Sequence, residues 1–248
     1  MEPLESSRRK VARAKEHIAN LKVASRLFFD ACPYTIVVEP DLREPKQEIH
    51  KLRLDGPLPD SFTNFTDDAV HNLRSALDNL GYALAVSSGR VDPKSTAFPF
   101  SGTALQLDNN IKGRCKDIPE EIYPLFRAYQ PYKGGNDILW ALNEVSITDK
   151  HKLLTVALRS NLGNMSGVGV LSMPLDPTWD RIKKEIEIAT CVVGYTVKYH
   201  AEISLFVAFD EIAIVSGEPV LKVLDYFVDI VEDILSRVGA EARRLGIF

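Results

Sequence analysis

The sequence predicts an α+β protein: a helical N-terminal half with one β-hairpin, then a small antiparallel sheet and a long C-terminal helix. Two changes in the spacing of apolar residues lead to this prediction. The spacing is three to four residues before Leu153, becomes two after it, and returns to the helical value near residue 219. Helices and strands that come in separate runs are typical of α+β folds. We expect a single domain over residues 1–248, with a possible subdivision into 1–153 and 154–248.

The first helix is predicted over residues 6–30, with Lys and Arg opposite an apolar stripe, and Pro33 should end it. The stripe consists of Val11, Ala14, Ile18, Leu21 and either Ala24 or Leu27. The next two segments predict a hairpin, because YTIVVEP (34–40) is β-branched and aromatic while EIHKLRL (48–54) alternates.

A second long helix is predicted over residues 66–86. Asn64 or Thr66 could cap it, and Asp67 and Asp68 would lie in its first turn, where the helix dipole favours anions. Its buried stripe is expected at Val70, Leu73, Leu77, Leu80 and Leu84. Shorter helices are predicted near 103–112, after Pro119 in PEEIYPLFRAYQPY, and over about 137–151.

The second half predicts three or four antiparallel strands followed by one amphipathic helix. The strand signals lie in TVALR, GVGVLSM, EIEIATCVV and AEISLFVAF. The final helix begins near Pro219. Its inward stripe is expected at Val220, Leu224, Phe227, Ile230 or Val231, Ile234 and Val238.

Composition limits the function classes. The 248 residues include 34 acidic and 30 basic ones, so the net charge is −4 and nucleic acid is an unexpected partner. The cysteines Cys32, Cys115 and Cys191 are scattered, which predicts neither disulfides nor a metal site. The charged N-terminus predicts no secretory signal, and apolar runs too short for a span predict no membrane partner. We therefore expect a cytoplasmic protein without a cofactor.

One polar constellation stands out on two of the predicted helices. His71, Ser75 and Asp78 recur at i, i+4 and i+7, and Arg74 can reach Asp78. The stretch LWALNEVSITDKHKLL places further polar residues on a neighbouring helix, at Asn143, Asp149, Lys150 and His151. If the apolar stripes of the two helices pack together, these polar flanks meet.

The constellation has a catalytic and a structural interpretation. As a catalytic site, it would use His71, Asp78, Asn143, Lys150 and His151. Arg74 and Asp149 would then contact the ligand. The structural interpretation is a solvated helix surface with local ion pairs, which is the commoner role of such residues.

Established sequence motifs add little. The chain contains no GxxxxGK[ST], GxGxxG, GxSxG or HExxH. A nuclease strand with an acidic residue and Lys is suggested by Asp41 with Glu48 and Lys51, but the last two are three positions apart, one more than the motif requires. Glu48 and Lys51 should therefore point to opposite faces of a strand.

Two resemblances accompany these patterns. HNLRSALDNL, FPF, QPY and LWALNEVSITDKHKLL, which span about residues 70–154, resemble a group of uncharacterised bacterial and phage-borne proteins, which implies no particular activity. The helices also resemble those of HEPN-type ribonucleases, whose helices carry Arg-x4-6-His, and this implies a metal-independent ribonuclease dimer. The literal Arg-x6-His, Arg43 to His50, spans the predicted hairpin, so no catalytic residue is transferred.

Two hypotheses follow. The first is a protein that binds a partner or a small ligand, with a homodimer through the long terminal helices as one form. The second is a hydrolase acting on nucleic acid at the polar constellation. Net acidity and the missing catalytic motifs favour the first.

Overall fold

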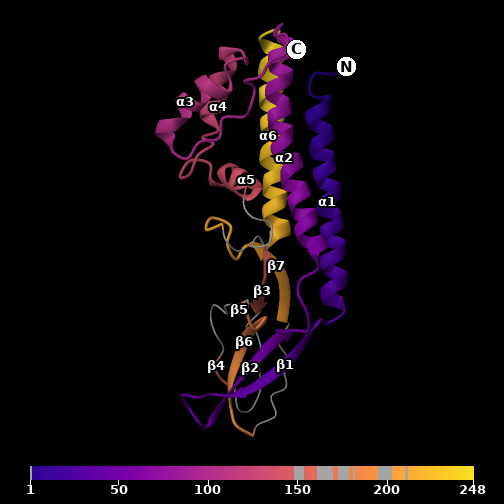
Figure 1. Ribbon diagram of the computed structural model, residues 1–248, viewed down its shortest axis with the longest axis vertical. Coiled ribbons are helices and arrows are strands. Elements are labelled where there is room, and N and C mark those ends of the chain that lie inside the picture. Colours follow the sequence, from indigo (N-terminus) through magenta and orange to yellow (C-terminus); the bar gives the residue numbers. More distant parts are fainter. Residues whose placement is uncertain are drawn as a thin grey trace.

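The computed structural model describes residues 2–147, 154–160, 170–172, 179–180, 182–194, 203–209 and 212–248. It confirms the α+β class (Figure 1). Long helices lie together at one end of an elongated molecule, and the strands lie at the other end. The helical elements are α1 (Glu5–Asp30), α2 (Asp60–Ser87), α3 (Ala104–Arg114), the 3-10 turn η1 (Glu120–Ile122), α4 (Tyr123–Ala128), α5 (Asp137–Ile147) and α6 (Val220–Arg244).

The helices α1, α2 and α6 contact one another and form the main layer of the molecule. The predicted stripe of α6 is buried, and Phe227 and Ile234 are fully shielded from solvent. In α1 the buried stripe runs from Val11 to Leu21, whereas Leu27 is 63% exposed. These stripes face the shared core, because burying each large apolar side chain contributes about 1.5–3 kcal/mol.

The predicted start of α2 at residue 66 is wrong by one and a half turns. The helix begins at Asp60, directly after Pro59. Thr66 therefore lies inside the helix, where its hydroxyl donates a hydrogen bond of 2.8 Å to the Phe62 carbonyl oxygen. Phe62 is buried and its ring lies 5.5 Å from that of Phe28 on α1. Tertiary packing of this ring thus extends the helix past the local capping signal.

The segment after Pro119 and the helix carrying Asn143 also differ in detail from their predicted extents. Pro119 has an extended backbone (φ −53°, ψ 132°), so a 3-10 turn precedes α4. Pro124 then occupies the first turn of α4, where its missing N–H leaves no hydrogen bond unmade. The helix predicted over 137–151 is described to Ile147, and residues 148–153 lie outside the described part.

The strands form two antiparallel sheets. In the larger one β1 (Tyr34–Pro40), β2 (Gln47–Leu54), β6 (Glu185–Val192) and β4 (Val170–Ser172) follow in that order, and β5 (Trp179–Asp180) also pairs with β6. The smaller sheet consists of β3 (Leu154–Ser160) and β7 (Ile203–Phe209). The predicted hairpin is therefore one side of a sheet that the second half of the chain completes.

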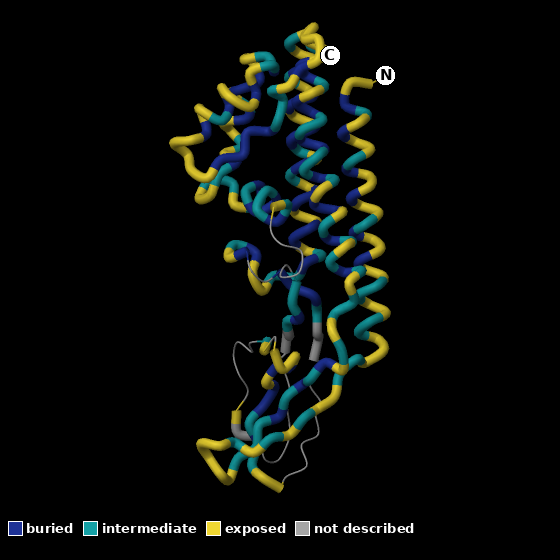
Figure 2. The backbone as a smooth tube through the Cα atoms, viewed as in Figure 1, coloured by how far each residue is buried: buried dark blue, intermediate teal, exposed yellow. Residues whose placement is uncertain are grey.

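Two separate clusters of buried side chains stabilise the two ends (Figure 2). The larger cluster joins α1, α2, α5 and α6 with the end of β7. The smaller one lies on the β2–β6 pair and contains Leu52, Ile186 and Ile188, with Tyr34 and Trp179 packed against it. None of the described helices is long and apolar enough to cross a membrane.

Candidate functional site

Arg74 links three parts of the fold with one side chain. Its Nη1 donates a hydrogen bond of 2.7 Å to Asp78 on the same helix, and its Nε donates one of 3.4 Å to Asn143 on α5. The guanidinium carbon also lies 4.4 Å from the centre of the Phe100 ring, a cation–π distance. We call Arg74, Asp78, Asn143 and Phe100 the Arg74 joint.

Asp78 completes this joint with a backbone contact. Its Oδ1 accepts a hydrogen bond of 3.0 Å from the Phe98 N–H, in addition to the one from Arg74. Asn143 in turn donates to Glu144 at 3.4 Å. The structure thus brings Arg74, Asp78 and Asn143 together, as the sequence predicted. All of these hydrogen-bond partners are protein groups. The polar side chains therefore satisfy one another where α2, α5 and the Phe98–Phe100 segment pack together.

The other predicted site residues are placed differently. His71 is exposed on α2 and forms no hydrogen bond or ion pair with a described residue. Asp149, Lys150 and His151 lie outside the described residues. The shared site of His71 and His151 therefore stays a prediction. The apolar seam proposed beneath it is present, since Leu73, Leu77 and Leu142 are fully buried where α2 contacts α5.

Sequence reasoning missed a second group of charged residues, on the larger sheet. Glu185 on β6 accepts hydrogen bonds from Lys51 Nζ at 2.9 Å and from Arg53 Nη2 at 2.7 Å. Glu39 on β1 accepts from the same two side chains, at 2.6 Å from Lys51 and 3.3 Å from Arg53. We call these four residues the sheet charge cluster.

The cluster is electrostatically balanced, with two acids and two bases. The side chain of Glu185 is 4% exposed. Burial alone would raise the pKa of Glu185, but the hydrogen bonds from Arg53 and Lys51 outweigh it and hold that pKa below its usual value. The hydrogen bond from Lys51 likewise lowers the pKa of Glu39. A set whose charges are matched in this way joins β1, β2 and β6 and presents little unmatched charge to a ligand.

Part of this cluster could have been recognised from the sequence. Lys51 and Arg53 are two apart on one strand, and Lys51 lies opposite Val37 in the hairpin register. Glu39 is two residues from Val37, so it shares a face with Lys51 and Arg53. Glu185 is 132 residues away in the chain from Arg53, and no local pattern connects them. Glu48 instead contacts His50 at 3.0 Å, which agrees with the expectation that Glu48 and Lys51 point apart. Within the described residues, no three His, Cys, Asp or Glu side chains are grouped so that they could hold a metal ion.

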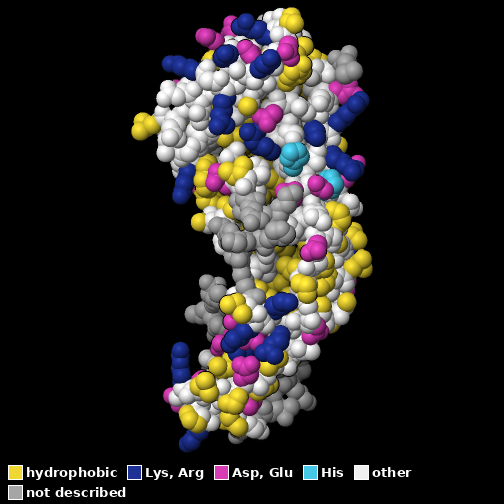
Figure 3. Space-filling view, in the orientation of Figure 1, with side chains coloured by type: hydrophobic (Ala, Val, Ile, Leu, Met, Phe, Trp, Pro, Cys, Tyr) yellow, Lys and Arg dark blue, Asp and Glu magenta, His cyan; other side chains and the backbone are white. Residues whose placement is uncertain are grey.

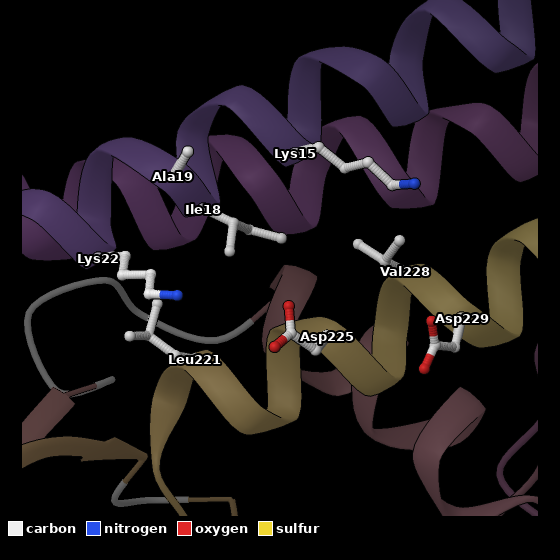
Figure 4. A pocket seen from close by; sticks show the side chains of 8 residues that line it. All are labelled: Lys15, Ile18, Ala19, Lys22, Leu221, Asp225, Val228 and Asp229. Carbon is white, nitrogen blue, oxygen red and sulfur yellow. The ribbon is translucent and has the colours of Figure 1, made fainter.

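A long groove runs between α1 and α6. Its central hollow has a volume of about 590 Å³ and is lined by Lys15, Ile18 and Lys22 from α1 and by Leu221, Asp225 and Val228 from α6 (Figure 4). A second hollow of about 350 Å³ shares Lys15 with it. A third, of about 310 Å³, shares Lys22 and Leu221. The three hollows form one line along the two helices, which we call the α1–α6 groove.

The walls of this groove carry opposite charges above an apolar floor. The α1 wall presents Arg8, Lys15 and Lys22, and the α6 wall presents mainly acids, at Asp225, Asp229 and Glu232. Lys15 and Glu232 form an ion pair of 2.8 Å across the groove. On the face in Figure 3, basic and acidic side chains are mixed over the helical part. In the groove, by contrast, the basic and the acidic side chains lie mainly on different walls.

Comparisons with known proteins do not identify this site: no protein-family model, no curated protein and no solved structure matches the chain. The roles of these residues must therefore be argued from their geometry.

Proposed function

We propose that this chain is a partner-binding protein whose recognition surface is the α1–α6 groove. The observation that supports the proposal is the combination of an apolar floor with a basic and an acidic wall. An amphipathic helix binds such a groove by placing its apolar stripe on the floor and its charged flanks against the walls. Charged walls of opposite sign would also fix the orientation of the bound helix.

The polar residues elsewhere support binding rather than catalysis. In the Arg74 joint, Arg74 and Asp78 already contact protein groups, so a substrate would have to displace them. The sheet charge cluster is likewise paired internally. As part of the proposal we place the protein in the cytoplasm of a bacterium, where the exposed, free Cys32 would stay reduced.

A designed peptide tests the proposal. The peptide is an amphipathic helix of about 20 residues, long enough to span about 30 Å, with an apolar stripe, acids on one flank and bases on the other. We expect it to raise fluorescence anisotropy on binding, whereas a peptide of shuffled order and equal composition should not bind. Added salt should weaken binding, because the flanking contacts are screened.

A pair of variants locates the binding surface. Ala19 lines the central hollow, so Ala19→Trp should fill it and weaken peptide binding at least tenfold. Asn20, its exposed neighbour, lines none of the three hollows, so Asn20→Trp should bind the peptide as the wild type does. Equal binding by both variants, or no binding by the wild type at concentrations where it is monomeric, would overturn the proposal.

A further inference from the structure

We infer that the occupant of the α1–α6 groove is a second copy of this chain, related by a twofold axis that runs along the groove. In this dimer α1 of each copy faces α6 of the other. The inference rests on the proposed function, because it names the partner of the same surface. Three features support it: the register of the two helices, the charges on the two walls and the size of the face.

The ion pair between Lys15 and Glu232 fixes which residues face each other across the groove. The helices α1 and α6 run in opposite directions (Figure 1). Lys22 lies seven residues after Lys15 on α1, and Asp225 lies seven residues before Glu232 on α6, so both lie on the same side of the ion pair along the groove. Lys22 lies beside Leu221, and Asp225 lies nearer to Ile18 (Figure 4). Figure 4 shows the side chains of both residues on opposite sides of the hollow.

Charge complementarity selects one of the two ways in which two grooves can face each other. A twofold axis across the groove would place α1 against α1 and set basic walls face to face. A twofold axis along the groove places the basic wall of one copy on the acidic wall of the other. Lys22 of each copy then faces the stretch of α6 in the other copy that carries Leu221 and Asp225. Bringing like charges together costs free energy, whereas charges of opposite sign attract each other. The twofold axis along the groove is therefore favoured.

The side chains that this dimer would pair are those that lack an ion pair within one copy. Lys22, Asp225 and Asp229 form none with the other described residues, although all three line the central hollow. Their neighbours are engaged: Lys15 contacts Glu232 at 2.8 Å, and Arg26 contacts Asp30 at 3.5 Å. Three charged side chains in the central hollow are therefore available to a partner.

The size of the face suits a dimer that dissociates on dilution. From Arg8 to Phe29 the groove follows α1 for 21 residue steps (29 − 8), about 30 Å, and two helices span about 20 Å, which gives about 600 Å² per copy. A standard interface buries about 800 Å² per partner. The main apolar stripe of α6 is buried within the monomer, so it is not available to a partner, whereas the groove is open.

Cross-linking between single-cysteine variants tests the twofold axis. In a Cys32→Ser background, which removes the exposed native thiol, Lys22→Cys and Asp225→Cys are made separately. Mixed together and treated with a short bismaleimide, they should form a cross-linked dimer, whereas each alone should remain uncross-linked. The matched control is Asn20→Cys mixed with Asp225→Cys, which should not react. Efficient self-cross-linking of Lys22→Cys would mean an axis across the groove and would overturn the inference.

Charge reversal tests the pairing itself by sedimentation equilibrium. Lys22→Glu places an acid opposite the Asp225 of the partner and should raise the dissociation constant of the dimer at least tenfold. The double variant Lys22→Glu with Asp225→Lys restores opposite charges and should return the constant to near the wild-type value. Arg13→Glu, on the outer surface of α1, should leave it unchanged.

The outcomes separate this inference from the proposed function. A chain that stays monomeric at every concentration but still binds the designed peptide, with Ala19→Trp abolishing that binding, overturns the dimer and leaves the groove as a binding surface. A chain that neither dimerises nor binds the peptide overturns both. A dimer that Lys22→Glu and Ala19→Trp leave intact uses another surface, which also overturns the inference.

Discussion

Arg74 shows how one side chain can look like a ligand-binding group in the sequence and serve as a packing contact in the fold. Its i+4 spacing from Asp78 is visible in the sequence, and the structure confirms the pair at 2.7 Å. The contacts with Asn143 and Phe100 involve residues 69 and 26 positions away (143 − 74 and 100 − 74), so no local spacing indicates them. These distant contacts give the residue its structural role.

The first prediction concerns Arg74→Lys. A lysine keeps the charge but cannot hydrogen-bond Asp78 and Asn143 while stacking a planar group on Phe100. We expect the free energy of unfolding, measured with urea, to fall by about 1–2 kcal/mol. Arg13→Lys is the matched control, because Arg13 and Glu16 form an exposed pair that contributes little. A folded, fully stable Arg74→Lys protein would contradict the structural role and return Arg74 to the list of ligand contacts.

The second prediction concerns pH and the sheet charge cluster. The pKa values of Glu185 and Glu39 are lowered in the folded protein, so their ionised forms stabilise it. This contribution is present above the ordinary glutamate pKa of about 4.3 and disappears as the pH falls through the lower, folded-state values. Glu185→Gln should therefore destabilise the sheet at pH 7, and its difference from the wild type should shrink below about pH 4.

Trp179 supplies the measurement for this pH prediction. It packs against the small cluster of Leu52, Ile186 and Ile188, so its fluorescence in a Trp140→Phe background follows the larger sheet. Glu16→Gln, at an exposed ion pair on α1, is the control and should follow the wild type at every pH. The loss of unfolding free energy caused by Glu185→Gln could instead stay constant from pH 7 to pH 3. Acid would then not act on the sheet through the sheet charge cluster.

At the scale of the element, α2 shows how closely a helix can approach a loop. Gly81 lies inside this helix, where glycine costs about 1 kcal/mol relative to alanine. A Cβ placed on Gly81 would lie 1.9 Å from the backbone oxygen of Thr96 and 3.1 Å from Ile118 Cδ1. The glycine therefore allows the chain after Pro93 to cross the helix at backbone distance, which positions Phe98 and Phe100 for the Arg74 joint.

The third prediction follows from this crossing. Gly81→Ala should lower the free energy of unfolding by about 2–3 kcal/mol, because a backbone oxygen cannot move away as a flexible side chain would. Gly113→Ala is the matched control: Gly113 is exposed on α3 with nothing within 4 Å of the added Cβ. The free energy of unfolding of Gly113→Ala should rise by about 0.5 kcal/mol, because alanine has a higher helix propensity than glycine. Chemical denaturation of both variants checks the contrast, and equal effects would argue against the close approach.

Element-scale patterns explain which predictions the structure confirms. The stripes of α1 and α6, the hairpin and the return to a helix after residue 219 follow from periodicity, which depends on local burial alone. The start of α2 was predicted wrongly because Phe62 packs on Phe28 of another helix. The pairing of β2 with β6 depends on contacts across more than 130 residues, and the separate sheet of β3 and β7 also joins segments that are distant in the chain. The groove depends on the angle between α1 and α6, which periodicity does not encode.

At the scale of the molecule, two cores of unequal size stabilise the two ends of the chain. The larger core joins the helices and contains dozens of side chains, whereas among the described residues the hydrophobic cluster of the larger sheet contains three buried ones, Leu52, Ile186 and Ile188. Burying each such side chain contributes about 1.5–3 kcal/mol to stability, so hydrophobic burial stabilises the larger sheet much less than it stabilises the helices. Regions with few buried contacts open at lower free energy than the global unfolding.

The last prediction is that the larger sheet opens while the helices stay folded, and hydrogen exchange read by mass spectrometry can test it. Leu52→Ala removes a buried side chain from the small core, and Leu77→Ala removes one from the large core, each at a cost of about 2–5 kcal/mol. Leu52→Ala should speed exchange in β1, β2 and β6 and leave α2 and α6 unchanged. Leu77→Ala should speed exchange in the helices, while the sheet, which already opens more easily, keeps its wild-type rates. If Leu52→Ala speeds exchange in α6 as much as in β2, the two cores unfold together, and the sheet must then be held by contacts with the helices rather than by its own three side chains.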